Sequence, residues 1–393
     1  MIETRFKDTE IGKIPEEWEV GKIGNLCSIN TGSKNTEDKD DEGKYPFYVR
    51  SQKIEHIDTF SYDCEAVLTA GDGAGTGKVF HYVNGKFDVH QRVYVMNDFC
   101  QCLYPKYFYW QFSENFYSRV KSMTAKSSVD SVRKGMIADM QIALPPFSEQ
   151  RRIATALSNV DALIAAVEKK IEKKKLIKQG TMQQLLTGKK RLNGYKGEWV
   201  EKRLGEVGKL DRNSINPKLE PNKIFYEYSM PAYDIGRQPI KCLGDTMNSN
   251  RFIVKGEMLL FNKLNVRQKR IWLIDPHNDN SVCSQEFLPF TSTKVCLEYI
   301  AQLVATDWVT DAFIEKSKGT SNSQKRISPN DFLDYEISIP SDPSEQRAIA
   351  SILSNMDSEI TALERKRDKL KELKQGMMQQ LLTGKIRLVR CSG

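Results

Sequence analysis

The chain has 393 residues, of which 39% are hydrophobic and 28% charged, with a net charge of +8. That length predicts two or three domains, and the basic excess favours a polyanionic partner, although it is weak evidence by itself. The sequence contains no run of 18 apolar residues and no signal-peptide pattern at its start, which excludes a membrane-spanning or exported chain and predicts a cytoplasmic one.

Residues 1–17 form an N-terminal arm, and residues 18–144 are predicted to form a first globular domain. Strand-like runs rich in β-branched and aromatic residues occupy 66–69, 78–83 and 92–95. The domain therefore has a β component.

Asn84-Gly85 follows the second of these runs and favours a hairpin turn there. A helix is predicted from Pro105 to Lys121, with aromatic residues at helical spacing. The first domain is thus predicted to be mixed, with strands and one clear helix.

The glycine-rich loop 71–78 resembles a nucleotide-binding loop but fails both tests. Asp72 stands where a P-loop requires glycine, and Val79 where it requires Ser or Thr. Thr76 occupies the place of the third glycine of GxGxxG. We expect instead a tight turn that lets another backbone, that of DNA included, approach closely.

Residues 145–192 form a predicted helical region. Ser148 follows two prolines and is the expected N-cap, and Gly188 is the expected C-terminal stop. A helix over 149–187 would be roughly 58 Å long.

Residues 193–339 form a predicted second globular domain. It contains strands at 257–261 and 270–274 and a helix at 302–316. Between the strands, residues 262–269 carry Asn, Gln and Arg, which can make bidentate contacts to bases.

Each predicted domain helix is followed by a polar loop, at 123–128 and at 318–326. Both loops combine hydroxyl and basic residues, and the second adds amides, which is the chemistry used for phosphate oxygens and base edges. An ordinary solvated loop is the alternative interpretation.

Residues 340–393 repeat the helical region. The segment 344–388 matches 148–192 at an offset of 196, with 29 of 45 aligned residues identical. Before each copy stands an IxLP or IxIP ending, at 142–145 and 337–340, and each half opens on Glu-Trp. The chain is therefore two half-molecules, each a variable domain followed by a long helix.

Apolar residues recur in both helical copies with the 4-3-4-3 spacing of a coiled-coil seam. The predicted seam residues are Ile153, Leu157, Val160, Ile164, Val167, Ile171, Ile349, Leu353, Met356, Ile360, Leu363 and Leu370. The predicted fold class is α+β: two globular domains and two long helices that pair as an antiparallel coiled coil, with a pseudo-two-fold internal repeat.

The eight cysteines form no CxxC pair, and the four histidines add no zinc-ligand spacing. We expect reduced, mostly buried thiols and no metal site. Catalytic patterns are also missing. Residues 144–147 resemble the Pro-Pro-aromatic core of amino-methyltransferases but lack its Asn or Asp. We find no glycine motif for S-adenosylmethionine, no helicase motif and no convincing nuclease carboxylate cluster, so we expect a chain that is not an enzyme and binds no cofactor.

These motifs together resemble the specificity (S) subunit of a Type I restriction–modification system over essentially the full length. The resemblance rests on the two SEQRxIA…LSNxD…KQGxMQQLLTGKxRL segments, the apolar endings and the Glu-Trp openings. It implies two target recognition domains, each reading one half of a split site in double-stranded DNA, and a coiled coil that sets the spacer.

The resemblance also implies partners. Two methyltransferase (M) subunits would dock on the helices and methylate adenine N6 with S-adenosylmethionine. Two restriction (R) subunits would join that core with ATP and Mg and direct DNA cleavage. Alternatives are a methylation-only system, a catalytic methyltransferase, and a coiled-coil scaffold that binds no nucleic acid.

Candidate site residues follow from loop chemistry and from the repeated polar positions of the helices. Candidates for DNA contact are Gly73, Gly75, Lys78, Gln91, Arg92, Lys126, Ser127, Ser128, Arg133, Asn262, Lys263, Asn265, Arg267, Gln268, Lys269, Thr320, Ser321, Asn322, Gln324, Lys325 and Arg326. Candidates for partner docking are Gln150, Arg151, Lys178, Gln179, Gln183, Gln346, Arg347, Lys374, Gln375 and Gln379.

Overall fold

The computed structural model describes residues 4–123, 131–321 and 323–389. It divides into two compact units: unit 1 is Met1–Glu168 with Arg365–Gly393, and unit 2 is Lys169–Glu364. Each unit therefore combines one globular domain with a stretch of both long helices. Within the described ranges, no helix is long and apolar enough to cross a membrane.

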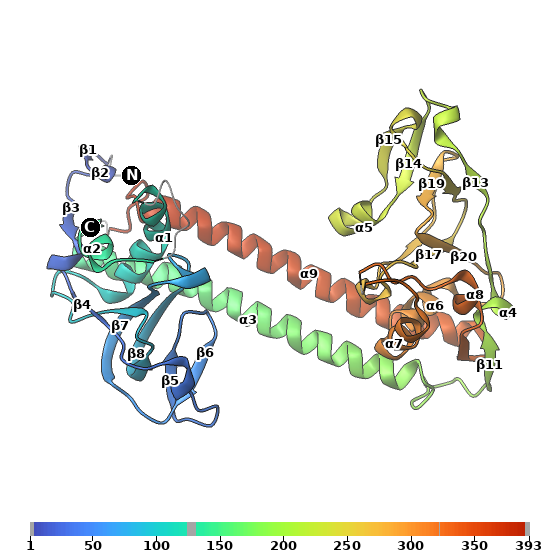
Figure 1. Ribbon diagram of the computed structural model, residues 1–393, viewed down its shortest axis with the longest axis horizontal. Helices are drawn as coiled ribbons and strands as arrows, with labels where there is room; N and C mark the ends of the chain where they lie inside the picture. Colours follow the sequence, from blue (N-terminus) through green and yellow to red (C-terminus); the bar gives the residue numbers. More distant parts are fainter. Residues whose placement is uncertain (1–3, 124–130, 322, 390–393) are drawn as a thin grey trace. The chain divides into compact units, whose positions relative to one another are not determined.

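Unit 1 is built on a six-stranded sheet with the order β4-β9-β7-β8-β5-β6 (Figure 1). Its strands are β4 (Ser28–Thr31), β5 (Tyr45–Tyr48), β6 (Ile54–Ile57), β7 (Tyr62–Ala70), β8 (Phe80–Val89) and β9 (Val93–Asn97). All neighbours are antiparallel except β5 and β8. Helix α1 (Pro105–Met123) contacts β7 and β8, and Phe80 meets Phe112 of α1 edge to face.

Smaller elements complete unit 1. They are the hairpin β1 (Phe6–Thr9)–β2 (Gly12–Pro15), the pair β3 (Glu19–Lys22)–β10 (Gln141–Leu144), the helix α2 (Lys134–Ala138) and the 3-10 turns η1 (Ile23–Asn25), η2 (Thr36–Asp38) and η3 (Gly73–Gly75). The β3–β10 pair joins the opening of the domain to the segment that precedes the long helix α3.

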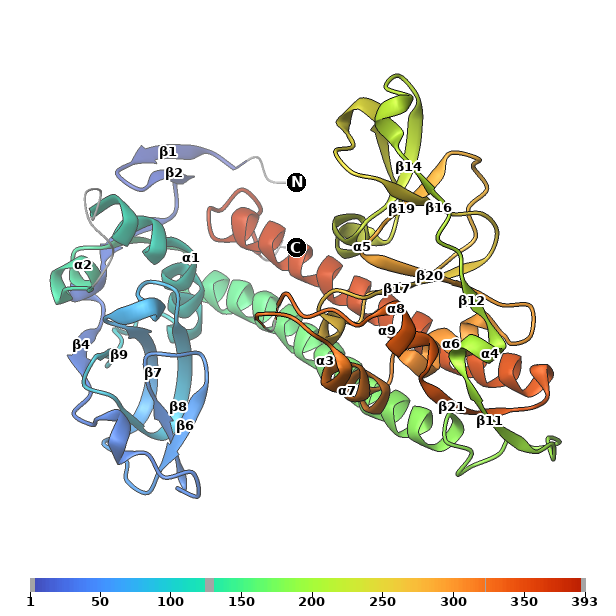
Figure 2. The same cartoon turned by 45° about the vertical axis from the view of Figure 1, so that its right-hand side comes forward.

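Unit 2 contains a four-stranded sheet, β12-β20-β17-β18, and a five-stranded sheet, β13-β16-β19-β14-β15 (Figure 2). The strands of the first are β12 (Lys209–Leu210), β17 (Met258–Asn262), β18 (Ile271–Ile274) and β20 (Phe287–Thr291); those of the second are β13 (Ser214–Ile215), β14 (Ile224–Tyr228), β15 (Ile240–Leu243), β16 (Arg251–Ile253) and β19 (Ser281–Ser284). A further pair, β11 (Trp199–Arg203)–β21 (Glu336–Pro340), repeats the role of β3–β10.

The remaining elements of unit 2 are short. They are α4 (Leu204–Val207), α5 (Met230–Gly236), α6 (Leu297–Val304), α7 (Asp307–Lys316), α8 (Pro329–Leu333) and the 3-10 turns η4 (Pro217–Leu219), η5 (Gly244–Thr246) and η6 (Val266–Gln268). Phe261 of β17 packs against Phe313 and Phe332, so the α7 and α8 segments close the core beside the four-stranded sheet.

Two expectations about the domains are wrong. Asn84 and Gly85 do not form a hairpin turn, because both lie inside β8 and pair with Glu65 and Cys64 of β7. The predicted helix 302–316 spans parts of two helices, α6 and α7, which are separated by Ala305 and Thr306. The strands at β17 and β18 and the helix α1 are confirmed.

The long helices are α3 (Phe147–Leu185) and α9 (Pro343–Leu381). Ser148 and Ser344 are therefore not N-caps, because each lies inside the first turn. At α9 the cap is Asp342, whose carboxylate accepts hydrogen bonds from the hydroxyl and the backbone N–H of Ser344, and these bonds hold the pKa of Asp342 below its usual range.

Gly188 and Gly384 follow the two helix ends with a φ of +70° each, as expected for C-terminal stops. A Cβ atom on Gly188 would lie 3.1 Å from the ring of Trp199, and one on Gly384 would lie 3.1 Å from the ring of Trp18. Each helix end is thus packed on the Glu-Trp opening of a domain.

Within each unit, stretches of α3 and α9 run antiparallel. In unit 1, Lys374 pairs with Asp161 at 2.6 Å and Lys371 with Glu168 at 2.7 Å; in unit 2, Lys178 pairs with Asp357 at 2.6 Å. The predicted seam residues lie inside: Ile153, Leu157, Val160, Ile164, Val167, Ile171, Ile349, Leu353 and Ile360 are buried, and Met356, Leu363 and Leu370 are half-buried.

The cysteines differ from expectation at one place. Cys100 and Cys102 form a disulfide, so these two are not reduced thiols in this structure. Cys27 and Cys283 are buried free thiols, and burial raises the pKa of Cys27 to about 12. Cys391 lies outside the described residues. The described ranges contain no group of His, Cys, Asp or Glu arranged to hold a metal ion.

Candidate nucleic-acid interface and subunit contacts

The glycine loop of unit 1 is packed against the backbone of two other loops of the same unit. A Cβ atom on Gly75 would lie 2.5 Å from the carbonyl oxygen of Arg50, and one on Gly71 would lie 2.9 Å from that of Arg92. The close approach that glycine permits is therefore made by the loop before β6 and the turn before β9. Gly73 has a φ of +75°, which explains glycine at that position.

This packing places three charged side chains together. Asp72 accepts a hydrogen bond from Arg50 at 2.8 Å and lies 3.7 Å from the Nε atom of Arg92. The arginine side chains are 44% and 64% exposed, whereas Asp72 is 20% exposed. Two guanidinium groups thus face solvent while one partly buried carboxylate holds them.

The backbone of Arg92 is fixed by His90. Its N–H group donates to the Nδ1 atom of His90 at 3.0 Å, an interaction that requires an unprotonated Nδ1. Burial lowers the pKa of His90, and Arg50 lowers it further. The neutral imidazole therefore keeps the turn and its arginine in place near neutral pH.

The loop that follows α1 returns to the same site. Val132 donates a backbone hydrogen bond to Gly71 at 2.6 Å, and Ser131 forms a β-bridge with Asp72. The structure thereby joins the glycine loop to the segment that precedes α2. The candidates Lys126, Ser127 and Ser128 lie outside the described residues.

The other DNA candidates of unit 1 are on the surface. Lys78, Gln91, Arg92 and Arg133 are exposed, and Gln91 donates to Asn35. Sequence reasoning missed Arg50 and Asp72, because nothing in their local pattern distinguishes them from other loop charges. Only the folded loops bring them beside Arg92.

Unit 2 builds the same arrangement from different residues. Asn265 donates to the carbonyl of Lys325 at 2.8 Å, Ile327 donates to that of Lys263 at 3.1 Å, and Leu264 forms a β-bridge with Arg326. The two loops predicted separately as DNA contacts, 262–269 and 318–326, are therefore hydrogen-bonded neighbours.

An acidic residue also holds an arginine here. Glu286, in the turn before β20, pairs with Arg326 at 3.1 Å. Ser131 and Val132 of unit 1 correspond to Arg326 and Ile327 of unit 2 at an offset of 195, the offset of the apolar endings that precede the long helices. The backbone connection is shared by the two units, and the side chains are not.

The candidates of unit 2 divide by exposure. Arg267, Gln268, Thr320, Ser321, Gln324 and Arg326 are exposed; Lys263, Asn265, Lys269 and Lys325 are half-buried. Asn262 is 2% exposed, and its side-chain Oδ1 atom accepts a hydrogen bond from the backbone N–H of Leu264, so its side chain supports the loop and is not free to contact a base. Lys269 pairs with Asp307. Asn322 lies outside the described residues.

Several docking candidates act inside the units. Gln150 and Gln346 are each 1% exposed, and their side chains accept from the backbone N–H of Tyr104 and Cys296. Burial removes these two glutamines from any docking surface, which corrects the expectation.

Other docking candidates make contacts within their own unit. Lys178 and Lys374 pair with Asp357 and Asp161 between the helices. Gln179 donates to Asp307 and Gln375 to Glu114. The candidates Arg151, Gln183, Arg347 and Gln379 are exposed.

The repeated motifs form a buried ion pair in each unit, which the sequence pattern alone did not predict. Glu149, from the SEQ motif that opens α3, is fully buried and accepts two hydrogen bonds from Arg387, from the KIRL motif that follows α9, both at 2.8 Å. In unit 2, Glu345 is likewise buried and receives two hydrogen bonds from Arg191, at 2.7 and 2.6 Å. The acid of each copy pairs with the arginine of the other copy.

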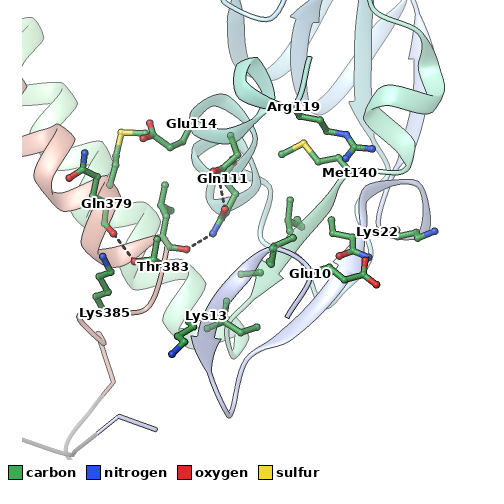
Figure 3. Close-up of a pocket in the computed structure, with 18 of the residues that line it drawn as sticks. Glu10, Lys13, Lys22, Gln111, Glu114, Arg119, Met140, Gln379, Thr383 and Lys385 are labelled. Carbon is green, nitrogen blue, oxygen red and sulfur yellow. Dashed lines mark hydrogen bonds between the residues drawn. The ribbon is translucent and has the colours of Figure 1, made fainter. Parts of the chain in front are cut away.

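A cavity of about 650 Å³ opens in unit 1 (Figure 3). The β1–β2 hairpin, α1, β10 and the end of α9 contribute its walls, including Lys13, Gln111, Glu114 and Gln379. Gln111 donates to the carbonyl of Leu382 at 2.7 Å and ties α1 to the end of α9. The exposed docking candidate Gln379 therefore borders a recess.

The fold is that of a duplicated chain, with an equivalent loop pair on each of two helix-braced domains. The chain belongs to the family of the Type I restriction modification DNA specificity domain, whose model matches residues 15–176 and 196–375. Membership confirms the resemblance stated from the motifs. A specificity subunit is a non-catalytic recognition chain.

Relatives and solved structures agree. The chain is 26% identical over 434 residues to the Type I restriction enzyme MjaVIII specificity subunit of Methanocaldococcus jannaschii, covering 98% of this chain and 97% of that one. It is 33% identical over 157 residues to the EcoDI specificity subunit of Escherichia coli, covering 40% of this chain and 33% of that one.

Among solved structures, the S subunit of a Type I restriction-modification system from M. genitalium matches with a TM-score of 0.65 at 14% identity, over 93% of this chain and 96% of that one. A chain from a study of complex assembly and conformational transition of the type I R-M system matches with a TM-score of 0.52 at 16% identity, over 95% and 99%. Both likenesses concern the fold, which is mixed α/β with two specificity domains.

Proposed function

We propose that this chain directs a Type I restriction–modification complex to a bipartite site in double-stranded DNA, with each domain reading one half. One observation carries the proposal: both units hold the same pair of loops by the same backbone hydrogen bonds, while the side chains on those loops differ. Loops held by the same backbone hydrogen bonds but carrying different polar side chains suit two domains that bind two different half-sites.

In this proposal, the long helices set the spacing of the two half-sites and bind the partner subunits. Their buried seam makes an antiparallel coiled coil, whose length fixes the distance between the two half-sites. Two M subunits dock on exposed polar positions that include Arg151, Gln183, Arg347 and Gln379, and R subunits join that core. The M subunits would bring S-adenosylmethionine and methylate adenine N6, which requires the base to leave the duplex; the R subunits would bring ATP and Mg.

The experiment is base-resolution detection of methyladenine in a host with and without this gene, with the M partner present in both. We expect a split motif that appears only with the gene. No gene-dependent motif, from a complex shown to be assembled, would overturn the reading role and favour a scaffold.

A second measurement tests the spacer. Insertion of one helical turn into α3 should change the spacer and leave both half-sites as they are. A changed half-site with an unchanged spacer contradicts the role given to the helices.

A further inference from the structure

We infer that Asp72 is a positioning residue that orients Arg50 and Arg92 as a pair of base-reading guanidinium groups in the first domain. The inference rests on the proposed function and deepens it by naming the residues that set one half-site. Arginine forks pair most often with guanine, so the half-site read by unit 1 should contain guanine at the positions they reach.

Three separate loops are assembled to make this group. Arg50 comes from the loop between β5 and β6, Asp72 from the glycine loop after β7, and Arg92 from the turn between β8 and β9. The backbones of both arginines are packed against glycines, which leave no room for a side chain at Gly71 or Gly75 without displacement. The positions of the arginine Cα atoms are therefore fixed by the fold, and Asp72 fixes the side-chain ends.

The carboxylate distinguishes base reading from phosphate binding. A site that only attracted phosphates would gain from two free arginines and would be weakened by an acid between them, because affinity for the backbone follows the positive charge. A site that reads a base edge needs a guanidinium group in one orientation, and a fixed orientation reduces the entropy lost on binding. Arg50 and Arg92 remain 44% and 64% exposed while bound to the acid, so their remaining N–H groups are free to reach a ligand.

The second unit also holds an exposed arginine with a carboxylate beside its loop pair. Glu286 lies in the turn before β20, where unit 1 has Arg92 before β9, and it holds Arg326, which corresponds to Ser131. In unit 1 the acid lies in the glycine loop and the arginines lie in the β5–β6 loop and the turn before β9, whereas in unit 2 the acid lies in the turn and the arginine in the post-helix loop. Recurrence with different residues points to a role in recognition of different sequences.

The test compares Asp72→Asn with the wild type in the complex with the M partner. The matched control is Glu55→Gln, which removes one carboxylate from the exposed Lys53–Glu55 ion pair of the same domain. Equilibrium binding is measured on duplexes with the motif found by methyladenine detection and on duplexes without it, at several salt concentrations.

The two roles of the arginines, base reading and phosphate binding, predict opposite changes in affinity for the motif. If Asp72 positions base-reading arginines, Asp72→Asn lowers affinity for the motif about tenfold and leaves or raises affinity for other DNA. If the arginines only meet phosphates, the variant gains affinity for both duplexes alike. That second result overturns the inference. So does a ratio of motif to non-motif affinity that is the same in Asp72→Asn as in Glu55→Gln.

A second variant keeps the inference testable if Asp72→Asn does not fold. Arg50→Lys keeps the charge and an ion pair with Asp72 but removes the planar fork, so it should lose discrimination at one half-site and keep the other. Unchanged discrimination also overturns the inference. A wild-type complex with no motif at all overturns the proposed function, and a wild-type motif with an unaffected Asp72→Asn variant overturns only this inference.

Discussion

Replacement of Arg387 by Ala should strongly destabilise unit 1. Glu149 is fully buried and accepts four hydrogen bonds: two from Arg387 at 2.8 Å, one from the backbone of Leu388 at 3.1 Å and one from the Trp18 ring at 3.2 Å. The substitution removes the cation and two of these bonds and leaves a buried carboxylate. Removal of one partner from a buried ion pair costs about 3–5 kcal/mol of unfolding free energy.

Urea-dependent hydrogen exchange read by mass spectrometry measures the two units separately in the full chain. The loss should appear in unit 1 peptides, and Lys385→Ala, which removes an exposed cation two residues away, should leave them unchanged. Glu149→Gln combined with Arg387→Ala should recover part of the loss, because the buried charge is then gone. A loss below about 1 kcal/mol, or no recovery in the double variant, refutes the reasoning from a buried charge.

Three further predictions follow from burial, backbone packing and protonation. Leu157→Ala, at a fully buried seam position, should cost about 2–5 kcal/mol by denaturant unfolding, whereas Leu176→Ala, at a side chain 67% exposed, should cost far less; equal losses contradict the seam. Gly75→Ala should displace the loop from the Arg50 carbonyl and shift the melting temperature downward; an unchanged melting temperature contradicts the close approach. Because the pKa of His90 is lowered, the folded chain binds fewer protons than the unfolded chain at acidic pH. The unfolding free energy of unit 1 should therefore fall as the pH drops below about 6.5, and it should fall less in His90→Gln. Hydrogen exchange of unit 1 peptides that gives the same unfolding free energy at pH 7.5 and 5.5 contradicts this.

The long helices could be predicted because their evidence is repetitive. Apolar residues from Ile153 to Ile171 recur at one spacing, and the same pattern returns in the second copy. The helix starts were misplaced by two residues, because Phe147 and Pro343 can each occupy the first helical position. A boundary depends on one capping contact, whereas a face depends on many residues.

Local pattern failed where tertiary pairing decides. Asn84-Gly85 is a strong turn signal in isolation, yet β8 continues through it because each residue has a partner on β7. Gln150 and Gln346 were expected on the surface because the repeat conserves polar residues between its copies. Their burial shows that a polar position kept in both copies can be an internal anchor, here for the backbone before α1 and α6.

The two loop pairs show which features the duplication fixes and which it leaves free. Each loop pair is held through backbone atoms: Gly71 with Val132 in unit 1, and Lys263 with Ile327 in unit 2. Backbone hydrogen bonds place no demand on side-chain identity, so substitutions on the loops need not disturb the frame that presents them. The buried ion pair made by Glu149 does demand identity, since either partner alone is costly. The fold therefore requires the SEQ and GKxRL motifs in both copies, whereas the side chains on the loops can differ between the copies.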